Sequence, residues 1–199
     1  TTTSTLVYEL LAKTFPGKTH LCGNIGIPLC ETVLENGLME EGGHYIALEI
    51  SNFQLVNIDR FRPEAAVILN LTPDHVDFMG SLDAYYKSKT EVYRNMSGSD
   101  LFLLNADDPV LAEYTAKYPV NCTVRTFSTD RSDTDSCVSD GYVCVNGEKV
   151  LPLDLIKIIG KHNLQNIIVA VSIAKAFGVT NEDICSVIAD FRGVEHRIE

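Results

Sequence analysis

The sequence predicts an α/β protein in which helices flank a mostly parallel sheet and a small antiparallel β appendage is attached. Short apolar runs typical of strands alternate with longer segments of helical spacing over most of the chain. This order favours parallel strands joined by crossover helices. Between Cys122 and Leu153 the pattern changes to closely spaced β segments, which include an Asn-Gly turn at Asn146-Gly147. Such a turn indicates a tight hairpin.

Composition narrows the class of protein. The chain has 199 residues and is 45% hydrophobic, which is enough for a globular core. Its formal charge of -11 disfavours nucleic acid and anionic membrane surfaces as partners. The six cysteines form no CxxC pair, so we interpret them as reduced core residues and expect a cytoplasmic protein. No apolar stretch approaches the roughly 20 residues that cross a bilayer, and we recognise no signal peptide.

Glycine and proline divide the first half of the chain into short elements. We expect, in order, a helix from residue 1 to about Lys13, a strand Thr19 to Cys22, a helix opened by Pro28, a buried strand Tyr45 to Ile50, and an edge strand Gln54 to Val56.

The run Ala66 to Leu69 predicts a strand buried on both faces. It stops in Asn70, Thr72 and Pro73, so the strand delivers His75 to the sheet edge outside its carboxyl end. In open α/β sheets this edge is where ligands bind.

Helices and strands continue to alternate in the second half. The expected elements are a helix Leu82 to Asn95, a strand Leu101 to Leu104, a helix from Pro109 to Lys117, a hairpin Tyr142 to Leu151, a long helix after Gly160 to Phe177, and a helix Asn181 to Asp190 capped by Thr180.

The chain opens with Thr1-Thr2-Thr3-Ser4-Thr5, which reads as the first turn of a helix with nothing before it. We therefore expect an excised piece of a longer chain. These hydroxyls are ordinary helix caps, or they form the phosphate end of a P-loop. In the second case the pattern GxxxxGK[ST] places its last residue at Thr1 and its other fixed residues before the chain.

Glu49 is a carboxylate in an apolar strand, a costly position unless it is paired or bound to a metal. A core salt bridge is one interpretation. Its place at the strand end, followed by Ser51 and Gln54, favours a ligand for Mg2+, which prefers oxygen donors.

Five further side chains, each with an ordinary interpretation, complete the candidates. His75 is a loop histidine satisfied by its neighbours, or a functional imidazole oriented by Asp74 and Asp77. Lysines on the tyrosine-rich helix, Lys89 among them, are usually solvated, and Arg197 is usually a surface group but suits phosphate binding. Asn163 and Asn166 are helix caps, or they present carboxamides to an adenine edge.

Taken in order, the motifs resemble the central ATP-binding domain of the Mur ligases, a P-loop NTPase-like fold. The segments that carry the resemblance are Thr1-Thr2-Thr3 (as the continuation of GTNGK), Gly23-Asn24-Ile25-Gly26, Asn70 to His75, Asn105 to Asp108, Gly160 to Asn163 and His196 to Glu199. It spans essentially the whole chain. Residues 48–55 are similar to the ExSSFQL segment of the members that add D-glutamate, with Asn52 in place of the second serine.

The resemblance implies roles for the candidate residues. Thr1 and Glu49 would bind the Mg2+ of ATP, Thr2 would lie at the phosphates, and His75 would hold a second Mg2+. Lys89 matches a lysine that the family carbamylates and would then also face metal. The remaining expected contacts are Asn24, Ser51 and Gln54 with substrate, Asn163 and Asn166 with adenine, and Arg197 with phosphate.

The implied reaction is ATP-dependent amide formation through an acyl phosphate, joining D-glutamate to UDP-N-acetylmuramoyl-L-alanine in peptidoglycan synthesis. Residues 1–199 would be the central domain of a monomeric enzyme whose uridine-nucleotide domain, P-loop lysine and amino-acid domain lie outside this sequence. We expect the fragment alone to be inactive. The open alternatives are a sibling or folate-extending ligase, a non-catalytic nucleotide-binding module, and an unrelated P-loop kinase.

Overall fold

The computed structural model describes residues 1–73 and 79–194 and divides the chain into two compact units. The first unit comprises residues 1–49 and the chain from residue 136 onward, and the second comprises residues 50–135. The chain therefore leaves the first unit, builds the second and returns. Each unit is described separately.

The first unit contains a two-stranded parallel sheet, three antiparallel strands and most of the long helices. Its elements are α1 (Thr2–Thr14), β1 (Thr19–Gly23), α2 (Leu29–Glu35), β2 (Tyr45–Glu49), β6 (Ser136–Ser139), β7 (Tyr142–Val145), β8 (Glu148–Pro152), the 3₁₀ turn η2 (Leu153–Leu155), α7 (Lys161–Ala176) and α8 (Asn181–Asp190).

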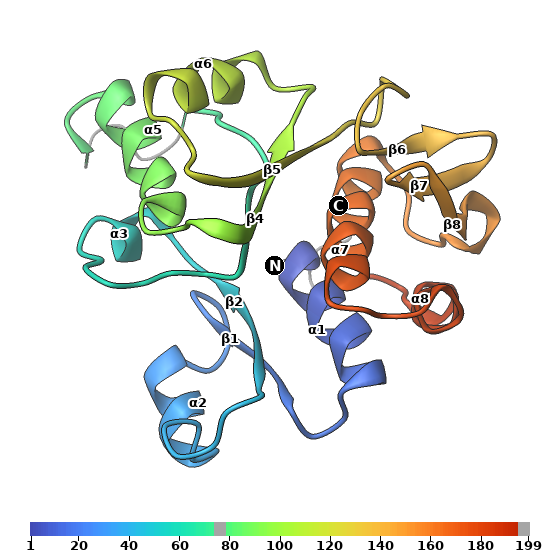
Figure 1. The fold of residues 1–199 in the computed structure, drawn as a ribbon, viewed down its shortest axis with the longest axis horizontal. Coiled ribbons are helices and arrows are strands. Elements are labelled where there is room, and N and C mark those ends of the chain that lie inside the picture. Colours follow the sequence, from blue (N-terminus) through green and yellow to red (C-terminus); the bar gives the residue numbers. More distant parts are fainter. Residues whose placement is uncertain (74–78, 195–199) are drawn as a thin grey trace. The chain divides into compact units, whose positions relative to one another are not determined.

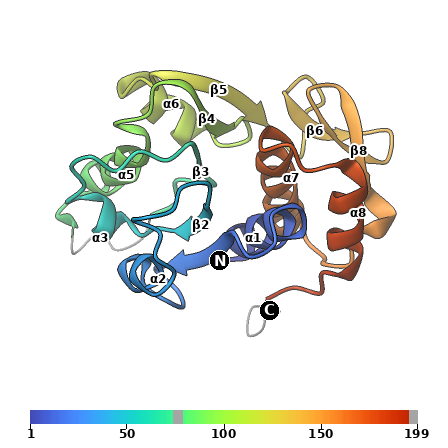
Figure 2. The same ribbon diagram turned by 60° about the horizontal axis from the view of Figure 1, so that its bottom comes forward.

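Strands β1 and β2 are parallel and in register from Thr19 opposite Tyr45 to Gly23 opposite Glu49. Their carboxyl ends therefore meet at one edge, where Glu49 is the last residue of β2. Helix α1 lies beside α7 in both ribbon views (Figures 1 and 2). The sequence correctly predicts both strands, and α1 to within one residue at each end.

Helix α7 forms the core of the first unit. Every residue from Ile167 to Ala174 is buried, so this helix is enclosed on all sides rather than amphipathic. Leu6 and Leu10 of α1 are fully buried as well. The first two turns of α7, which carry Asn163 and Asn166, are less enclosed than its middle.

The structure confirms the predicted hairpin and the predicted cap of the last helix. Strands β7 and β8 are antiparallel and joined at Asn146 and Gly147, whose φ values of 51° and 79° are those of a tight hairpin turn. Thr180 caps α8 by accepting a hydrogen bond from Asp183 N.

The second unit is a three-stranded parallel sheet with helices. Its elements are α3 (Asn52–Leu55), β3 (Ala65–Ile68), α5 (Leu82–Thr90), the 3₁₀ turn η1 (Glu91–Tyr93), β4 (Gly98–Asn105), α6 (Pro109–Lys117) and β5 (Cys122–Phe127). Strand β4 pairs in parallel with both β3 and β5. Its core joins Phe102 of β4 to Tyr85, Tyr86 and Tyr93 on and after α5.

The predicted edge strand Gln54 to Val56 is wrong. Residues 52–55 form the short helix α3, in which the Ser51 and Gln54 side chains make a reciprocal capping box. The S-x-x-Q spacing encodes this start locally. We missed it because the apolar residues that follow also suit a strand.

Burial differs from expectation at several positions. In β3 only Ala66 and Ile68 are buried, so the strand alternates instead of being enclosed on both faces. In β2 only Ala47 is buried. The helix expected to reach Asn95 ends at Thr90 and tightens into η1. All six cysteines are free, as expected, but Cys30 is exposed rather than in the core.

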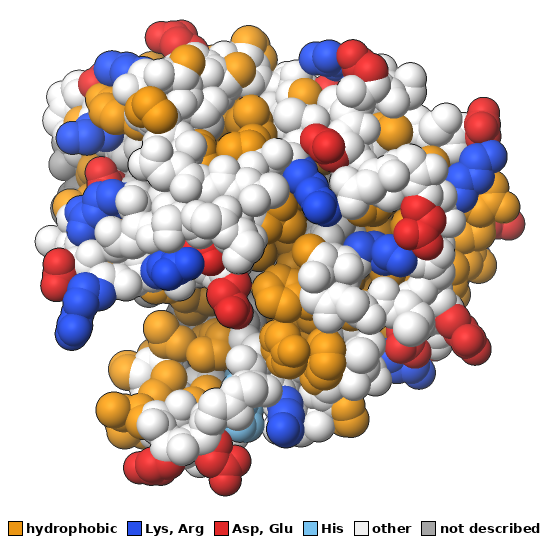
Figure 3. Space-filling view, viewed as in Figure 1, with side chains coloured by type: hydrophobic (Ala, Val, Ile, Leu, Met, Phe, Trp, Pro, Cys, Tyr) orange, Lys and Arg blue, Asp and Glu red, His pale blue; other side chains and the backbone are white. Residues whose placement is uncertain are grey.

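Helix α2 is packed more loosely than the other helices of its unit. Thr32 is its one buried residue, whereas Leu34 is 74% exposed. Figure 3 shows hydrophobic side chains on the surface of this region. Within residues 1–73 and 79–194, no helix has the length and apolar character needed to cross a membrane.

Candidate active site

Glu49 ends β2 next to the first turn of α1. Its Oε2 lies 2.7 Å from the Thr1 nitrogen and 3.4 Å from Ser4 Oγ. The Glu49 side chain is 22% exposed, so it is accessible and is not a core residue. Where a residue precedes Thr1, this nitrogen is a peptide N–H, and the contact is a hydrogen bond without a full positive charge.

Burial by itself raises the pKa of the Glu49 carboxyl, but the charge of a free Thr1 nitrogen and hydrogen bonds from this nitrogen and from Asn24 outweigh it. The pKa therefore lies below its ordinary value, and the side chain is an anion at neutral pH. The N-terminus of a helix favours anions, and if a phosphate bound beside the Glu49 carboxylate, a cation such as Mg2+ between the two anions would offset their repulsion.

Thr1 is the N-cap of α1, but its hydroxyl does not cap the helix. Ser51, Ser81, Asp108 and Thr180 all accept a hydrogen bond from their helices. Thr1 Oγ1, in contrast, is buried and has no hydrogen-bond partner among the described residues. A buried hydroxyl left in this state is costly, which points to a ligand that completes it.

A tight loop after β1 brings Asn24 to the same strand end. Asn24 N donates to Glu49 O at 2.7 Å. A Cβ on Gly23, whose φ is 125°, would lie 2.1 Å from that same oxygen. Glycine at this position is therefore required for the loop to approach β2 so closely. Asn24 is exposed and open to a ligand.

Asn163 and Asn166 occupy the first turns of α7, as predicted. Thr3 Oγ1 donates to Asn166 Oδ1 at 2.9 Å, which ties α7 to the first turn of α1. Asn163 Nδ2 donates to Ile159 O at 2.7 Å. The structure thus brings together Thr1, Thr2, Glu49, Asn24 and Asn166 around the start of α1, through direct contacts or the adjoining backbone.

Ser51 and Gln54 lie in the second unit and bond to each other. Ser51 N donates to Gln54 Oε1 at 2.8 Å, and Ser51 Oγ donates to the same oxygen at 3.0 Å. Both remain at the surface, with Gln54 exposed. Their capping role explains this pair of residues without a substrate, and a substrate role stays a prediction.

Lys89 lies in the last turn of α5, with its Nζ 4.9 Å from the centre of the Tyr85 ring. It is half-buried, whereas Lys87 on the same helix is exposed. Contact with the face of an aromatic ring stabilises an ammonium group. Lys87 also lies over a ring, with its Nζ 5.8 Å from the centre of Tyr118, so the two lysines differ in exposure rather than in aromatic contact.

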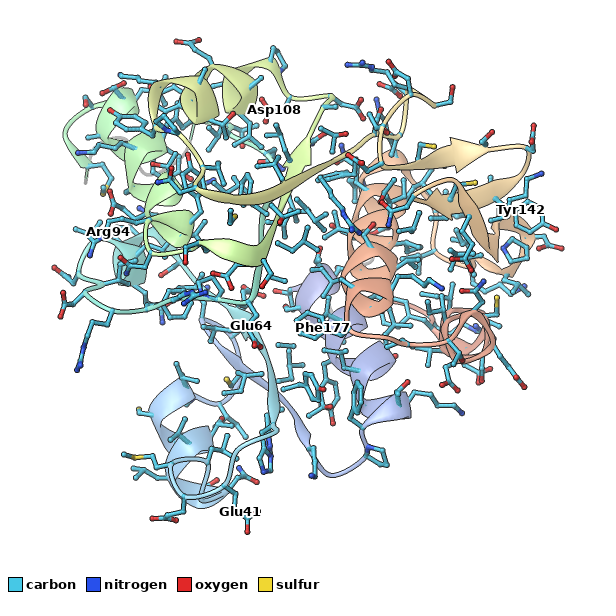
Figure 4. All side chains as sticks on the ribbon, in the orientation of Figure 1. Glu41, Glu64, Arg94, Asp108, Tyr142 and Phe177 are labelled. Atoms are coloured by element: carbon cyan, nitrogen blue, oxygen red, sulfur yellow. The ribbon has the colours of Figure 1, made fainter. Side chains whose placement is uncertain are left out.

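Asn105 and Asp108, to which the sequence analysis gave no role, make structural hydrogen bonds. Asp108 Oδ1 caps α6 by accepting from Leu111 N, and its Oδ2 accepts from Leu71 N at 2.7 Å. Asn105 Nδ2 donates to Leu69 O at 2.7 Å. Figure 4 labels Asp108 at the start of α6. These bonds hold in place the segment that leaves β3 toward residue 74. From the sequence, an Asp before Pro109 predicts only the helix cap, not the bond to Leu71.

Asp74, His75, Asp77 and Arg197 lie outside the described residues. Lys89 belongs to the second unit and Glu49 to the first. The convergence of residues 49, 75 and 89 therefore stays a prediction.

The residues around Glu49 fit a Mg2+ ion. The Glu49 carboxylate and the unpartnered Thr1 hydroxyl are hard oxygen donors, and Mg2+ is commonly held by one or two such groups together with phosphate oxygens. Among residues 1–73 and 79–194, no group of three His, Cys, Asp or Glu side chains is arranged to hold a metal.

Comparison with known proteins gives consistent results. The profile of the family described as Mur ligase middle domain matches residues 1–174. UDP-N-acetylmuramoylalanine–D-glutamate ligase of Geobacillus kaustophilus is 38% identical over 200 residues, which cover 100% of this chain and 43% of that protein. The protein of the same name from Bacillus cytotoxicus is 36% identical over 202 residues, with the same coverage.

Among solved structures, MurF from Acinetobacter baumannii has a TM-score of 0.74 and 21% identity, covering 100% of this chain and 45% of that one. At this identity the likeness shows a shared fold. The chain thus spans less than half the length of the curated relatives it matches.

Proposed function

Because this chain belongs to the Mur ligase middle-domain family, we propose that it is the nucleotide-binding part of an ATP-dependent ligase that adds D-glutamate to UDP-N-acetylmuramoyl-L-alanine. The relatives that cover the whole chain at 36% and 38% identity carry the name of a D-glutamate ligase. They support this member of the family over its siblings.

One structural observation supports nucleotide binding most strongly. A buried, unpartnered Thr1 hydroxyl and an anionic Glu49 lie together at the N-terminus of α1. The first peptide N–H groups of a helix have no partners within it and favour anions. A phosphate at this helix end, together with a Mg2+ ion that Thr1 and Glu49 would hold, would satisfy the hydroxyl, the carboxylate and the helix end together.

In the proposed reaction, the substrate carboxylate attacks the γ-phosphorus of ATP to give an acyl phosphate and ADP. The amine of D-glutamate then attacks the acyl carbon, and phosphate leaves. Bound Mg2+ supplies charge neutralisation between the anionic partners. Within this chain, Thr1 and Glu49 would hold the ion, the first turn of α1 with Thr2 would orient the phosphates, and Asn24 would face the UDP-sugar.

The remaining roles are proposed from the family resemblance. His75 would hold a second Mg2+, and a carbamylated Lys89 would face it as an anion. Asn163 and Asn166 bind adenine, and Arg197 contacts phosphate. Ser51 and Gln54 contact substrate from the start of α3, where their capping box fixes the backbone.

We further propose that residues 1–199 act as the central domain of a longer, cytoplasmic, monomeric enzyme. Its partners are small-molecule substrates rather than nucleic acid or membrane, in keeping with a formal charge of -11. The 199-residue chain alone does not form the amide.

The test is phosphate release from ATP by the intact protein, with UDP-N-acetylmuramoyl-L-alanine and one amino acid at a time. Release that depends on D-glutamate supports the assignment. Release that depends on a different amino acid indicates a sibling ligase. No nucleotide binding at all contradicts the proposal.

A further inference from the structure

Two histidines form a direct hydrogen bond at the amino ends of β1 and β2. His20 Nε2 lies 3.0 Å from His44 Nδ1, and the two ring centroids are 5.3 Å apart. The centroid separation is close to the nitrogen–nitrogen distance plus the radii of both rings, so the two nitrogens point at each other. His20 belongs to β1, and His44 directly precedes β2. The pair is therefore separate from Glu49, which lies at the other end of β2.

The chain between α2 and His44 has few other attachments. Among the described residues, the backbone hydrogen bonds that residues 37–41 donate stay within residues 33–41. Gly42 and Gly43 follow, and Gly43 has a φ of 83°. Two successive glycines give this stretch of backbone unusual freedom. The bond between the rings therefore fastens the end of a weakly held segment to β1.

This bond depends on how many protons the two rings carry. A neutral imidazole has one N–H, so a neutral pair places one proton between the facing nitrogens. A first added proton enters at an outward nitrogen and leaves the bond in place. A second added proton puts an N–H on both facing nitrogens, and repulsion between two cations replaces the bond.

The groups around the pair favour one positive charge and oppose two. Glu41 Oε2 lies 4.0 Å from His44 Nε2, and Figure 4 labels Glu41 in the segment after α2. From the two helices, Tyr8 of α1 and Glu35 of α2 line a hollow together with His20. Burial, and next the positive charge of His44, lower the pKa of His20 below its ordinary 6.5. The folded pair therefore resists a second proton.

This resistance fixes the sign of the pH dependence. An unfolded histidine takes up its proton near pH 6.5, whereas folded His20 takes it up only at a lower pH. The contribution of the pair to stability is therefore complete above the ordinary pKa. It declines as the pH falls below that value.

We propose that His20 and His44 form an acid-operated latch that fastens residues 37–44 to β1 and releases them when both rings are protonated. The latch does not depend on the proposed nucleotide site, which lies at the opposite end of β2. The alternative is a fixed contact, in which protonation changes the rings but not the attachment of the segment.

The experiment measures amide hydrogen exchange by mass spectrometry on the intact protein that carries this chain, at about pH 7.5 and about pH 5, after correction for the intrinsic effect of pH on exchange. The peptide that covers residues 37–48 is expected to exchange about three- to tenfold faster at the lower pH, the range for loss of one hydrogen bond. A peptide from β4 in the second unit should show no such difference, which separates release of the latch from general unfolding in acid.

His20→Phe keeps a ring but removes the hydrogen bond, so residues 37–48 should exchange fast at both pH values. His44→Ala serves the same purpose if the phenylalanine variant does not fold. His162→Asn is the control, because His162 is exposed on α7, and it should retain the pH difference of the unmodified protein. The inference is overturned if the unmodified protein shows equal corrected rates at both pH values, or if His20→Phe keeps the pH difference.

Discussion

Glu49 Oε2 lies 2.7 Å from the nitrogen of Thr1, although one residue ends a strand and the other begins a helix in a different part of the chain. The contact places an anionic oxygen beside the buried Thr1 hydroxyl at a helix N-terminus. This combination of groups is the basis of the proposed magnesium–nucleotide site.

Glu49→Gln should lower ATP-dependent ligation by the intact protein at least about 100-fold, because a neutral amide is a poor ligand for Mg2+ and the ion supplies several kcal/mol. Phosphate release measured over a range of Mg2+ concentrations tests this. Glu41→Gln is the control, since the Glu41 side chain is 83% exposed. Near-normal turnover by Glu49→Gln at low Mg2+ would show that Glu49 is not a ligand.

Lys89→Met should reduce ligation about 100-fold, whereas Lys87→Met on the same helix should stay within about twofold. The physical reason is that carbamylation converts an amine into an anion suited to a metal. Incorporation of labelled bicarbonate, followed by nuclear magnetic resonance, should give a carbamate signal that Lys89→Met lacks and Lys87→Met retains. Equal loss of activity in both variants would argue against a specific role for Lys89.

Asp108→Ala should lower the free energy of unfolding by about 2 kcal/mol, because it removes both the cap of α6 and the acceptor for Leu71 N. Ser81→Ala removes a cap alone, from α5, and should cost about 1 kcal/mol. Urea unfolding of both variants measures the difference. Equal costs would mean that the Leu71 contact adds nothing to stability.

Protonation of Asp100 in acid should lower the stability of the folded protein. Its carboxylate accepts two hydrogen bonds from Arg62, at 2.6 and 3.1 Å, and one from Ser97 N. The Arg62 hydrogen bond is the largest cause that holds the pKa of Asp100 below the ordinary 3.8. Because the folded state binds this proton less readily than the unfolded state, the stabilisation is complete above the ordinary pKa. It is lost as the pH falls through the lower, folded value.

Urea midpoints measured from about pH 6 down to pH 2 should therefore fall more steeply for the unmodified protein than for Asp100→Asn. Asp59→Asn is the control, because its side chain is 93% exposed. Parallel curves for the unmodified protein and Asp100→Asn would contradict this prediction.

Local signals in the sequence account for most of the secondary structure. Thr180 before α8, Pro109 at the start of α6 and Asn146-Gly147 in the hairpin each act over a few residues, and the structure confirms all three. The error at α3 was also local. The S-x-x-Q spacing of Ser51 and Gln54 predicts the capping box, but the apolar residues that follow it fit a strand equally well.

The sequence by itself determined most of the elements, their order and the position of Glu49 at a strand end, because turn, cap and periodicity signals depend on neighbouring residues. Tertiary structure alone decided that residues 1–49 and the chain after residue 135 share a unit, that Thr1 leaves its hydroxyl unpartnered, and that Thr3 meets Asn166. These relationships join residues far apart in the chain. They arise only when packing fixes two helices side by side, which no local pattern encodes.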